Sequence, residues 1–146
     1  VKEIDAMTER PNVGVGVLII QDNRLLLAQR KGSHAEGTYG SVGGHVEFGE
    51  SPEDALKREA LEELGITLGN IAFLACINMI RYGKHYIDLG FQADIIAGTP
   101  EIQPAEADKF IQIGWYALDD LPNPLFAPIE AYLEAWKTGK RYFNLK

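Results

Sequence analysis

The chain has 146 residues and a net charge of -7, with 46% hydrophobic and 24% charged residues. This balance is typical of a globular protein, and the length fits a single domain over residues 1–146 with its own core. The negative charge argues against nucleic acid or an anionic membrane as the main partner, because phosphate backbones are bound by basic faces.

The first twelve residues, VKEIDAMTERPN, are polar and charged. A segment of this kind is neither a signal peptide nor a membrane span. We therefore expect a cytoplasmic protein without a membrane partner.

The first apolar segment, residues 13–21 (VGVGVLIIQ), is β-branched and predicts a buried strand. Asp22 and Asn23 then favour a tight turn, and residues 24–30 (RLLLAQR) return as the second strand of a hairpin. Residues 31–41 (KGSHAEGTYGS) contain several glycines and predict a loop.

The clearest helix of the sequence is SPEDALKREALEELG, residues 51–65. Ser51 suits the N-cap, Pro52 suits the first helical position, and Asp54 can complete a pair similar to a capping box. Gly65 suits the position just past the end of the helix.

Two long apolar runs follow, residues 66–80 and 85–96, and the RYGK segment between them predicts another hairpin. The single cysteine, Cys76, lies in the first run, which predicts a buried core thiol rather than a nucleophile. One cysteine also excludes an internal disulfide and a cysteine-based zinc site.

The last third of the chain predicts a loop over residues 100–109, a strand over 110–118 and an irregular segment over 121–128. The final segment, IEAYLEAWKTGK, has helical spacing and places Ile129, Leu133 and Trp136 on one face. Hairpins interrupted by two helices predict an α/β protein in which helices flank a mixed sheet.

The first predicted helix carries Glu59, Glu62 and Glu63 at i, i+3, i+4 spacing, so their carboxylates share one helix face. Like charges at this spacing cost about 0.2–0.5 kcal/mol per pair in an isolated helix. A divalent cation among them removes this cost, and Mg²⁺ prefers such oxygen ligands.

The alternative is a solvated helix face, stabilised by neighbouring acid–base pairs and by acids near the start of the helix. That alternative does not account for Gly43 and Gly44, which allow the backbone to approach a ligand, or for Gly49, which permits a tight turn into the helix. Glycines and acids together favour a metal and phosphate site.

These residues resemble the Nudix box, in which glycines, acids and one arginine recur at fixed spacing. The matching residues are Gly44, Glu50, Arg58, Glu59, Glu62, Glu63, Gly65 and Ile66. Ala60 replaces a larger aliphatic residue, which changes packing rather than chemistry. The resemblance covers residues 10–142 and is strongest to MutT-type nucleoside triphosphate diphosphatases. It implies a Nudix-type α/β/α sandwich around a mixed β-sheet.

The resemblance also implies the metal ligands. Glu59 and Glu63 are expected to be the main ligands of Mg²⁺, for which Mn²⁺ can substitute. Glu62 is expected to help directly or through water, and the carbonyl oxygen of Gly43 resembles a further ligand. The metal would neutralise the polyphosphate and lower the pKa of the attacking water.

Two further catalytic roles follow from the same resemblance. Glu59 matches the general base of some family members, although the base varies within the family. Arg58 is expected to orient the acids by pairing with Glu50.

Three further residues are candidates for contact with the substrate, and each has an alternative role without function. Arg30 and Lys31 contact phosphate or face solvent. His45 lies in the glycine loop, where it positions the substrate or serves as a polar loop residue.

Many family members add an acid from a later loop. Glu106 and Asp108 are available in PAEADKF, and Glu106 is as readily a solvated charge as a member of the site. One similar pattern would place this acid at Ile111, which has no carboxylate.

The remaining histidines and aromatic residues predict structural roles. The histidines are too scattered to form a zinc site, while one aromatic ring has base stacking as an alternative role. These residues are His34, His85, Trp115, Tyr116 and Phe126.

The resemblance implies Mg²⁺-dependent hydrolysis of nucleoside triphosphates, including purine or modified nucleotides, to a monophosphate and pyrophosphate. ADP-ribose is an alternative substrate, but its hydrolases commonly carry a proline after the box, and none lies between Ile66 and Thr99. Tyr82 weakly favours dinucleoside polyphosphates. Ser41 and Val42 replace a Leu-Pro pair of related enzymes and leave the base preference open.

A non-catalytic nucleotide sensor is the alternative from another functional class. Sensors usually lose the acids of the box, whereas all three helix acids are present here. Resemblance to dimeric relatives also predicts a homodimer.

Overall fold

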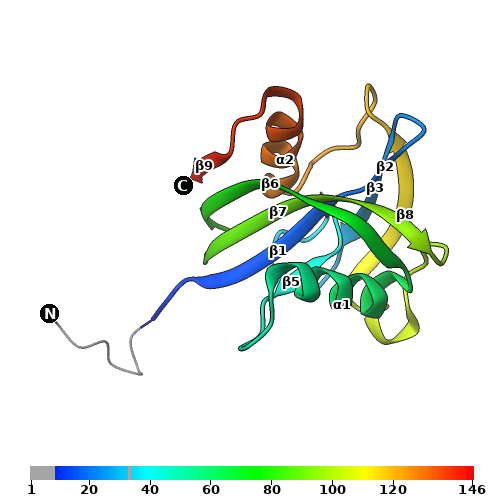
Figure 1. Ribbon diagram of the computed structural model, residues 1–146, viewed down its shortest axis with the longest axis horizontal. Coiled ribbons are helices and arrows are strands. Elements are labelled where there is room, and N and C mark those ends of the chain that lie inside the picture. The colour runs from blue at the N-terminus through cyan, green and yellow to red at the C-terminus, as the bar shows by residue number, and fades with distance from the viewer. Residues whose placement is uncertain (1–8, 33) are drawn as a thin grey trace, which may run out of the picture.

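The computed structural model describes residues 9–32 and 34–146 (Figure 1). Within these residues, two helices interrupt a series of strands, with a short 3-10 turn at Pro104–Glu106. In chain order they are β1 (Asn12–Leu18), β2 (Ile20–Gln21), β3 (Arg24–Arg30), β4 (Tyr39–Gly40), β5 (Gly43–His45), α1 (Pro52–Leu64), β6 (Thr67–Arg81), β7 (Lys84–Ala97), β8 (Phe110–Ala117), α2 (Ala127–Thr138) and β9 (Tyr142–Leu145).

The larger sheet of the described chain has the strand order β5-β1-β7-β6-β9. Strands β1 and β7 are parallel, as are β6 and β9, whereas β5 pairs with β1 and β6 pairs with β7 in antiparallel fashion. The predicted mixed sheet is therefore confirmed. A smaller sheet is centred on β3, which pairs with β2, β4 and β8.

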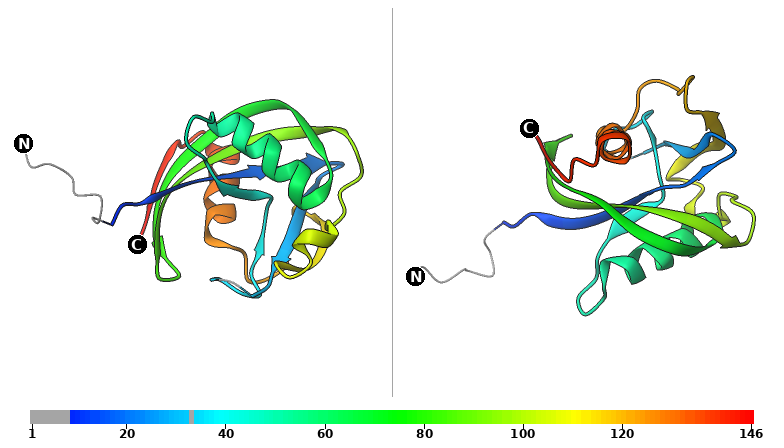
Figure 2. Two further views of the ribbon diagram at one scale, coloured as in Figure 1. Left: turned by 90° about the horizontal axis from the view of Figure 1, so that it is seen from below. Right: turned by 45° about the horizontal axis from the view of Figure 1, so that its top comes forward.

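Helices α1 and α2 cover opposite faces of the larger sheet (Figures 1 and 2). Strand β1 shows why, since Val15 and Val17 pack in the cluster under α1, while Leu18 packs in the cluster under α2. A strand that is apolar on both faces needs cover on both. This arrangement confirms the α/β sandwich.

Helix α1 begins and ends where its sequence predicts. The side chain of Ser51 accepts a hydrogen bond from the Asp54 amide, and Gly65 has the left-handed backbone that ends the helix. Its buried residues include Leu56, Ala60 and Leu64, which attach one face of the helix to the sheet. The other face is thereby left to the acids.

Three expectations about strands and helices need correction. Residues 13–21 form β1 and β2 rather than one strand, because the chain passes from the larger to the smaller sheet after Leu18. Strand β9 was not predicted, and it forms by parallel pairing with the distant β6. Helix α2 begins at Ala127, earlier than expected.

Two side chains are also more exposed than predicted. Trp136 is 39% exposed, and Tyr132 is instead the large aromatic residue that α2 buries. Cys76 is half-buried rather than in the core, since the alternation along β6 buries Ala75 and Ile77. Within the described residues, no helix is long and apolar enough to cross a membrane.

Candidate active site

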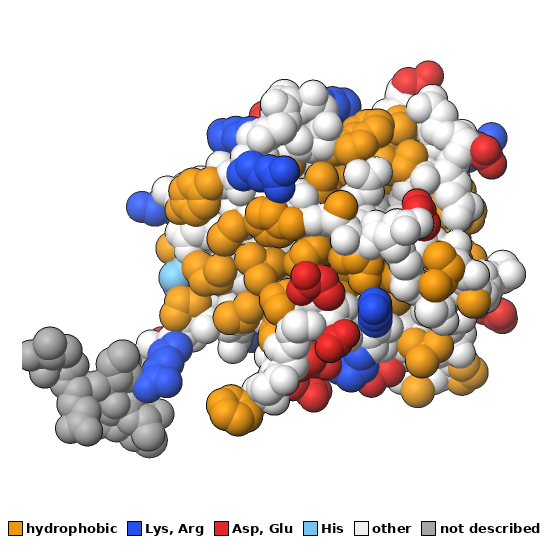
Figure 3. Space-filling view, viewed as in Figure 1, with side chains coloured by type: hydrophobic (Ala, Val, Ile, Leu, Met, Phe, Trp, Pro, Cys, Tyr) orange, Lys and Arg blue, Asp and Glu red, His pale blue; other side chains and the backbone are white. Residues whose placement is uncertain are grey.

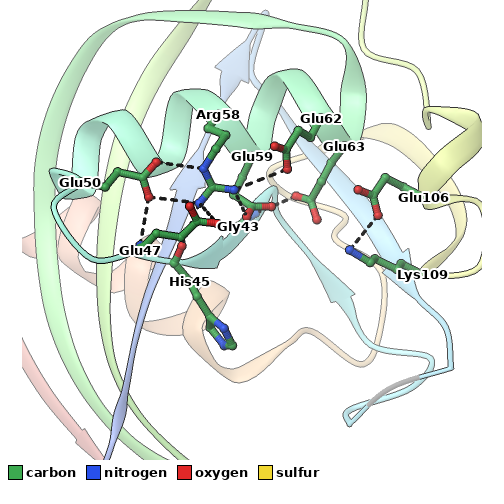
Figure 4. Close-up of polar contacts among 10 residues, drawn as sticks. All are labelled: Gly43, His45, Glu47, Glu50, Arg58, Glu59, Glu62, Glu63, Glu106 and Lys109. Carbon is green, nitrogen blue, oxygen red and sulfur yellow. Dashed lines mark hydrogen bonds and ion pairs between the residues drawn. The ribbon is translucent and has the colours of Figure 1, made fainter.

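Arg58 connects the acids of the site (Figure 4). Its Nε and Nη2 atoms donate to the two carboxylate oxygens of Glu50 at 2.9 and 3.1 Å. Its Nη1 donates to Glu59 at 2.8 Å and to Glu62 at 3.4 Å, and Nη2 also donates to the carbonyl oxygen of His45 at 3.0 Å. One guanidinium thus fixes acids of α1 relative to the glycine loop, and the expected pairing with Glu50 is present.

Glu63 is the buried acid of the site, with 5% of the residue exposed. Its Oε1 accepts a hydrogen bond from the amide of Gly43 at 3.0 Å. Burial raises the pKa of Glu63 to about 8, and the nearby charges of Glu59 and Glu106 act in the same direction. This contact is made through the N–H group of Gly43, and the expected role of its carbonyl oxygen as a metal ligand stays a prediction.

Glu59 lies against the backbone of Gly44. A β-carbon at Gly44 would come within 2.4 Å of the carboxyl carbon of Glu59, so a larger residue there would displace this acid. Burial raises the pKa of Glu59, while the ion pair with Arg58 opposes that shift. Glu59 can therefore occupy this position because residue 44 is a glycine.

A pocket of about 380 Å³ extends from these acids into the molecule. Gly43, Gly44 and Glu63 line it, and so do Asp88 of β7 and Tyr132 of α2. It also has an apolar lining, which includes Met79, Phe126 and Ile129. The pocket thus joins the buried acid Glu63 to an apolar lining suited to a flat organic group.

Arg30 and His45 line this pocket, whereas Lys31 is exposed and does not. The Arg30 guanidinium lies 4.3 Å from the ring centre of Phe126. Burial lowers the pKa of Arg30, and the charge of Glu63 opposes that shift. His45 Nε2 forms a hydrogen bond of 2.8 Å with the hydroxyl of Tyr86.

The late-loop acid Glu106 lies near the site, since its charge contributes to the raised pKa of Glu63. It forms an ion pair of 2.7 Å with Lys109, which also lines the pocket. Asp108 and Ile111 are exposed, and neither lines the pocket. Of the two candidates from this loop, the structure brings only Glu106 to the acids.

Aromatic rings surround the side of the pocket next to Arg30. Tyr82 stacks on Phe126 with ring centres 5.4 Å apart, and the His34 ring lies 6.2 Å from that of Tyr86. His34 and Phe126 line the pocket, so these two residues border the site in addition to the structural role expected for them. His85 instead bonds to Asn78 at 2.7 Å, away from the pocket.

The family model of the NUDIX domain matches residues 10–137. The chain belongs to the Nudix family. Among solved structures, it is 38% identical to a MutT Nudix hydrolase from Burkholderia pseudomallei, with a TM-score of 0.82 over 87% of this chain and 98% of the other. This similarity confirms both the family and the fold.

Two curated relatives of this Nudix domain carry different substrates in their names. The oxidized purine nucleoside triphosphate hydrolase of Mus musculus is 32% identical over 118 residues, which are 80% of this chain and 72% of the relative. The NAD-capped RNA hydrolase NudC of Pseudomonas aeruginosa is 36% identical over 106 residues, or 73% of this chain. The matched part is only 36% of the length of NudC.

Nudix hydrolases generally use divalent metal cations, and the acids of α1 suit one. Glu59, Glu62 and Glu63 provide hard oxygen donors, and a cation would offset the burial of the Glu63 charge. Across residues 9–32 and 34–146, no three donor side chains stand close enough to hold a metal as they are. Arg58 donates hydrogen bonds to Glu59 and Glu62 in this arrangement.

Sequence reasoning missed Asp88, Tyr132 and Lys109 of this Nudix pocket. A signal for Asp88 was available, because it shares one face of its strand with Tyr86 and Gly90 in an otherwise apolar run. Lys109 follows Glu106 by three residues, a spacing that favours an ion pair in a helical turn. Only the fold brings Tyr132 to Asp88.

Proposed function

We propose that this Nudix hydrolase cleaves nucleoside triphosphates to a nucleoside monophosphate and pyrophosphate in a Mg²⁺-dependent reaction. The observation that carries the proposal is the pocket that joins Glu63 and the glycine loop to an interior lined by Phe126 and Ile129. One end suits a polyphosphate and its metal, and the other suits a nucleobase. Mn²⁺ is expected to substitute for Mg²⁺.

The acids of α1 would hold the metal, with Glu59 and Glu63 as the main ligands and Glu62 assisting. When bound, Mg²⁺ neutralises the charge of the polyphosphate and lowers the pKa of the attacking water. Arg58 keeps Glu59 and Glu62 on the side of α1 that faces the glycine loop. Its own position is fixed by the two hydrogen bonds to Glu50.

Two cations that line the pocket are our candidates for binding phosphate. Arg30 and Lys109 both line it and both feel the charge of Glu63. Lys109 is already paired with Glu106, so its contribution includes positioning that acid. His45, held by Tyr86, is a further polar contact for the substrate.

A proton acceptor for the attacking water is available in Glu59. Its carboxylate is half-buried and lies against Gly44, in the position that matches the general base of some relatives. The ion pair with Arg58 opposes the effect of burial on the pKa of Glu59 and so favours the charged carboxylate, the form that can accept a proton.

Hydrolysis of a dinucleotide pyrophosphate is a second candidate, favoured by the 36% identity to NudC. The expectation of a small-molecule substrate in the cytoplasm, rather than a nucleic acid, remains a prediction. A substrate panel of dGTP, dATP, NAD, ADP-ribose and NAD-capped RNA separates these possibilities. Highest kcat/KM for a triphosphate supports our proposal, and highest kcat/KM for NAD or NAD-capped RNA contradicts it.

Product chromatography without added pyrophosphatase tests the bond that is cleaved. With dGTP and Mg²⁺, we expect dGMP and pyrophosphate in equal amounts, no turnover in EDTA, and recovery with Mg²⁺ or Mn²⁺. Early orthophosphate with accumulating dGDP would contradict the cleavage site. Full turnover in EDTA would contradict the metal requirement.

Glu63→Gln tests the role of the buried acid. The amide keeps the shape of the side chain and can still accept from Gly43, but it removes the charge that would hold the metal. We expect turnover to fall by orders of magnitude with no loss of thermal stability. Glu53→Gln, an exposed change on the same helix, is the matched control and should retain activity. Near-normal turnover of the Glu63→Gln variant would contradict the role of Glu63.

A further inference from the structure

Asp88 is a second buried acid of the pocket, and the proposed reaction does not use it. Only 8% of the residue is exposed, and burial raises the pKa of its carboxyl to about 6. Asp88 lies on β7 and is held by Tyr132 of α2, whereas Glu59, Glu62 and Glu63 lie on α1. Because α1 and α2 cover opposite faces of the larger sheet, Asp88 belongs to a different part of the site from the acids of α1.

The protein holds this carboxyl in place with Tyr132, whose hydroxyl donates a hydrogen bond to Oδ2 of Asp88. Room for the tyrosine ring is made by two glycines that pair between β1 and β7, Gly16 and Gly90. A β-carbon at Gly16 would lie 2.4 Å from the hydroxyl oxygen, and one at Gly90 would lie 2.3 Å from the ring. Two glycines in the middle of a sheet thus accommodate the group that orients one acid.

The other oxygen of Asp88 is available to a ligand. Among the described residues, the bond from Tyr132 is the one that the Asp88 carboxyl accepts, and it goes to Oδ2. Beside Oδ1 lies Gly14, where a β-carbon would stand 3.4 Å from Oδ1 and 3.3 Å from the ring of Tyr86. Gly14, Tyr86 and Asp88 all line the pocket, so a ligand bound there would lie beside the Asp88 carboxyl.

We propose that Asp88 is a specificity-determining residue that binds the edge of a guanine-type base, accepting hydrogen bonds from its adjacent N1–H and N2–H groups. This inference rests on the proposed function insofar as the base belongs to a nucleotide substrate. A carboxylate offers only acceptors, and guanine presents two neighbouring donors on that edge. Adenine and cytosine each present one donor beside one acceptor, which the carboxylate repels.

The surroundings of Asp88 also suit a flat ring. Met79 and Ile129 provide apolar walls, and the ring of Tyr86 lines the same pocket. A ring in this pocket would bring its polar edge to Oδ1 while its faces contact apolar side chains. A buried acceptor that is left without a hydrogen-bond donor is unfavourable. Bases that lack the two donors should therefore bind more weakly than in a pocket that recognises shape alone.

Binding of GMP and AMP in EDTA, measured by calorimetry at pH 8, tests the inference without the metal and without turnover. Wild-type protein is expected to prefer GMP by at least about tenfold. In Asp88→Asn, the amide presents one donor and one acceptor, so this preference should fall by at least about tenfold and AMP should bind as well or better. Asp94→Asn makes the same change at an exposed position of the same strand and should retain the preference.

Tyr132→Phe provides a second variant. It keeps the ring on Gly16 and Gly90 but removes the hydroxyl that fixes Asp88, so the preference for GMP should fall here too. An unchanged GMP preference in Asp88→Asn, or no GMP preference in the wild type, would overturn the inference.

The failure of the proposed function gives a different result. A protein that prefers GMP through Asp88 but hydrolyses no triphosphate would refute the proposed reaction and retain the base site. A protein that hydrolyses dGTP and dATP alike, with Asp88→Asn unchanged, would retain the reaction and refute the base site.

Discussion

Asp88 and Glu63 are both buried carboxyls that line the same pocket, yet their surroundings differ. Glu63 lies among other acids and accepts a backbone hydrogen bond from Gly43, whereas Asp88 accepts one from the Tyr132 hydroxyl. Burial raises the pKa of both, to about 8 and about 6. At neutral pH, burial therefore favours the protonated form of Glu63, while Asp88 is mostly charged and can accept hydrogen bonds.

The charge on Asp88 makes folding dependent on pH. Its pKa is about 6 in the folded protein and near 3.8 when exposed, so the folded state holds the proton more tightly. Stability from this group is complete below pH 3.8 and is lost as the pH rises through 6, a loss of about 3 kcal/mol. The titratable groups that feel its charge, Tyr132, Tyr86 and Cys76, all have raised pKa values and stay neutral over this range.

Urea unfolding of the wild type and of Asp88→Asn between pH 4 and pH 7.5 measures this effect. The difference in unfolding free energy should move in favour of the variant by about 3 kcal/mol over that range, because the amide does not titrate. Parallel pH profiles for the two proteins would show that Asp88 is not the group responsible. The Asp94→Asn variant should follow the wild type.

At the scale of helices and strands, features set by local residues could be predicted from the sequence, whereas pairing between distant strands could not. Helix α1 carries its own cap residues at Ser51 and Gly65, so its ends could be read from the sequence. Strand β9 exists only because it reaches β6, and β1 ends where the chain passes to the second sheet. Neither event leaves a signal within the segment itself.

The same distinction holds for the candidate site. Glu59, Glu62, Glu63 and Arg58 lie within two turns of one helix, so their common face follows from spacing alone. Asp88 lies on a strand and Tyr132 on the last helix, so the fold alone joins them. The strand alternation marked Asp88 as unusual, but it could not identify its partner.

Gly16→Ala tests the packing between β1 and α2. A β-carbon at this position would lie 2.4 Å from the hydroxyl oxygen of Tyr132 and about 3 Å from its ring, and the fully buried ring has no room to shift. We expect a loss of about 1–3 kcal/mol in unfolding free energy, as for other overpacked cores. Gly14→Ala, on the same strand, would meet neighbours only at 3.3 Å and should lose less. Equal stability of Gly16→Ala and wild type in urea unfolding would contradict this account.

At the scale of the whole molecule, apolar side chains and acids occupy different regions of the face drawn in Figure 3. Figure 3 shows apolar side chains gathered over the face on which β6 lies, with the acids of α1 below them. Large exposed apolar residues of this face include Phe73 and Ile80 of β6 and Tyr142 of β9, each at least 42% exposed. Apolar surface of this kind is typical of a contact with another protein.

We propose that this face joins two copies of the chain, which is the homodimer expected from the sequence. Light scattering at micromolar concentration should give twice the 16.2 kDa mass of one chain. Ile80→Glu places a charge on the face and should shift the mass toward the monomer, because a buried unpaired carboxylate is unfavourable. Ile111→Glu, on the second sheet, carries the same change away from this face and should leave the dimer intact. A mass of 16.2 kDa for the wild-type protein would refute the dimer.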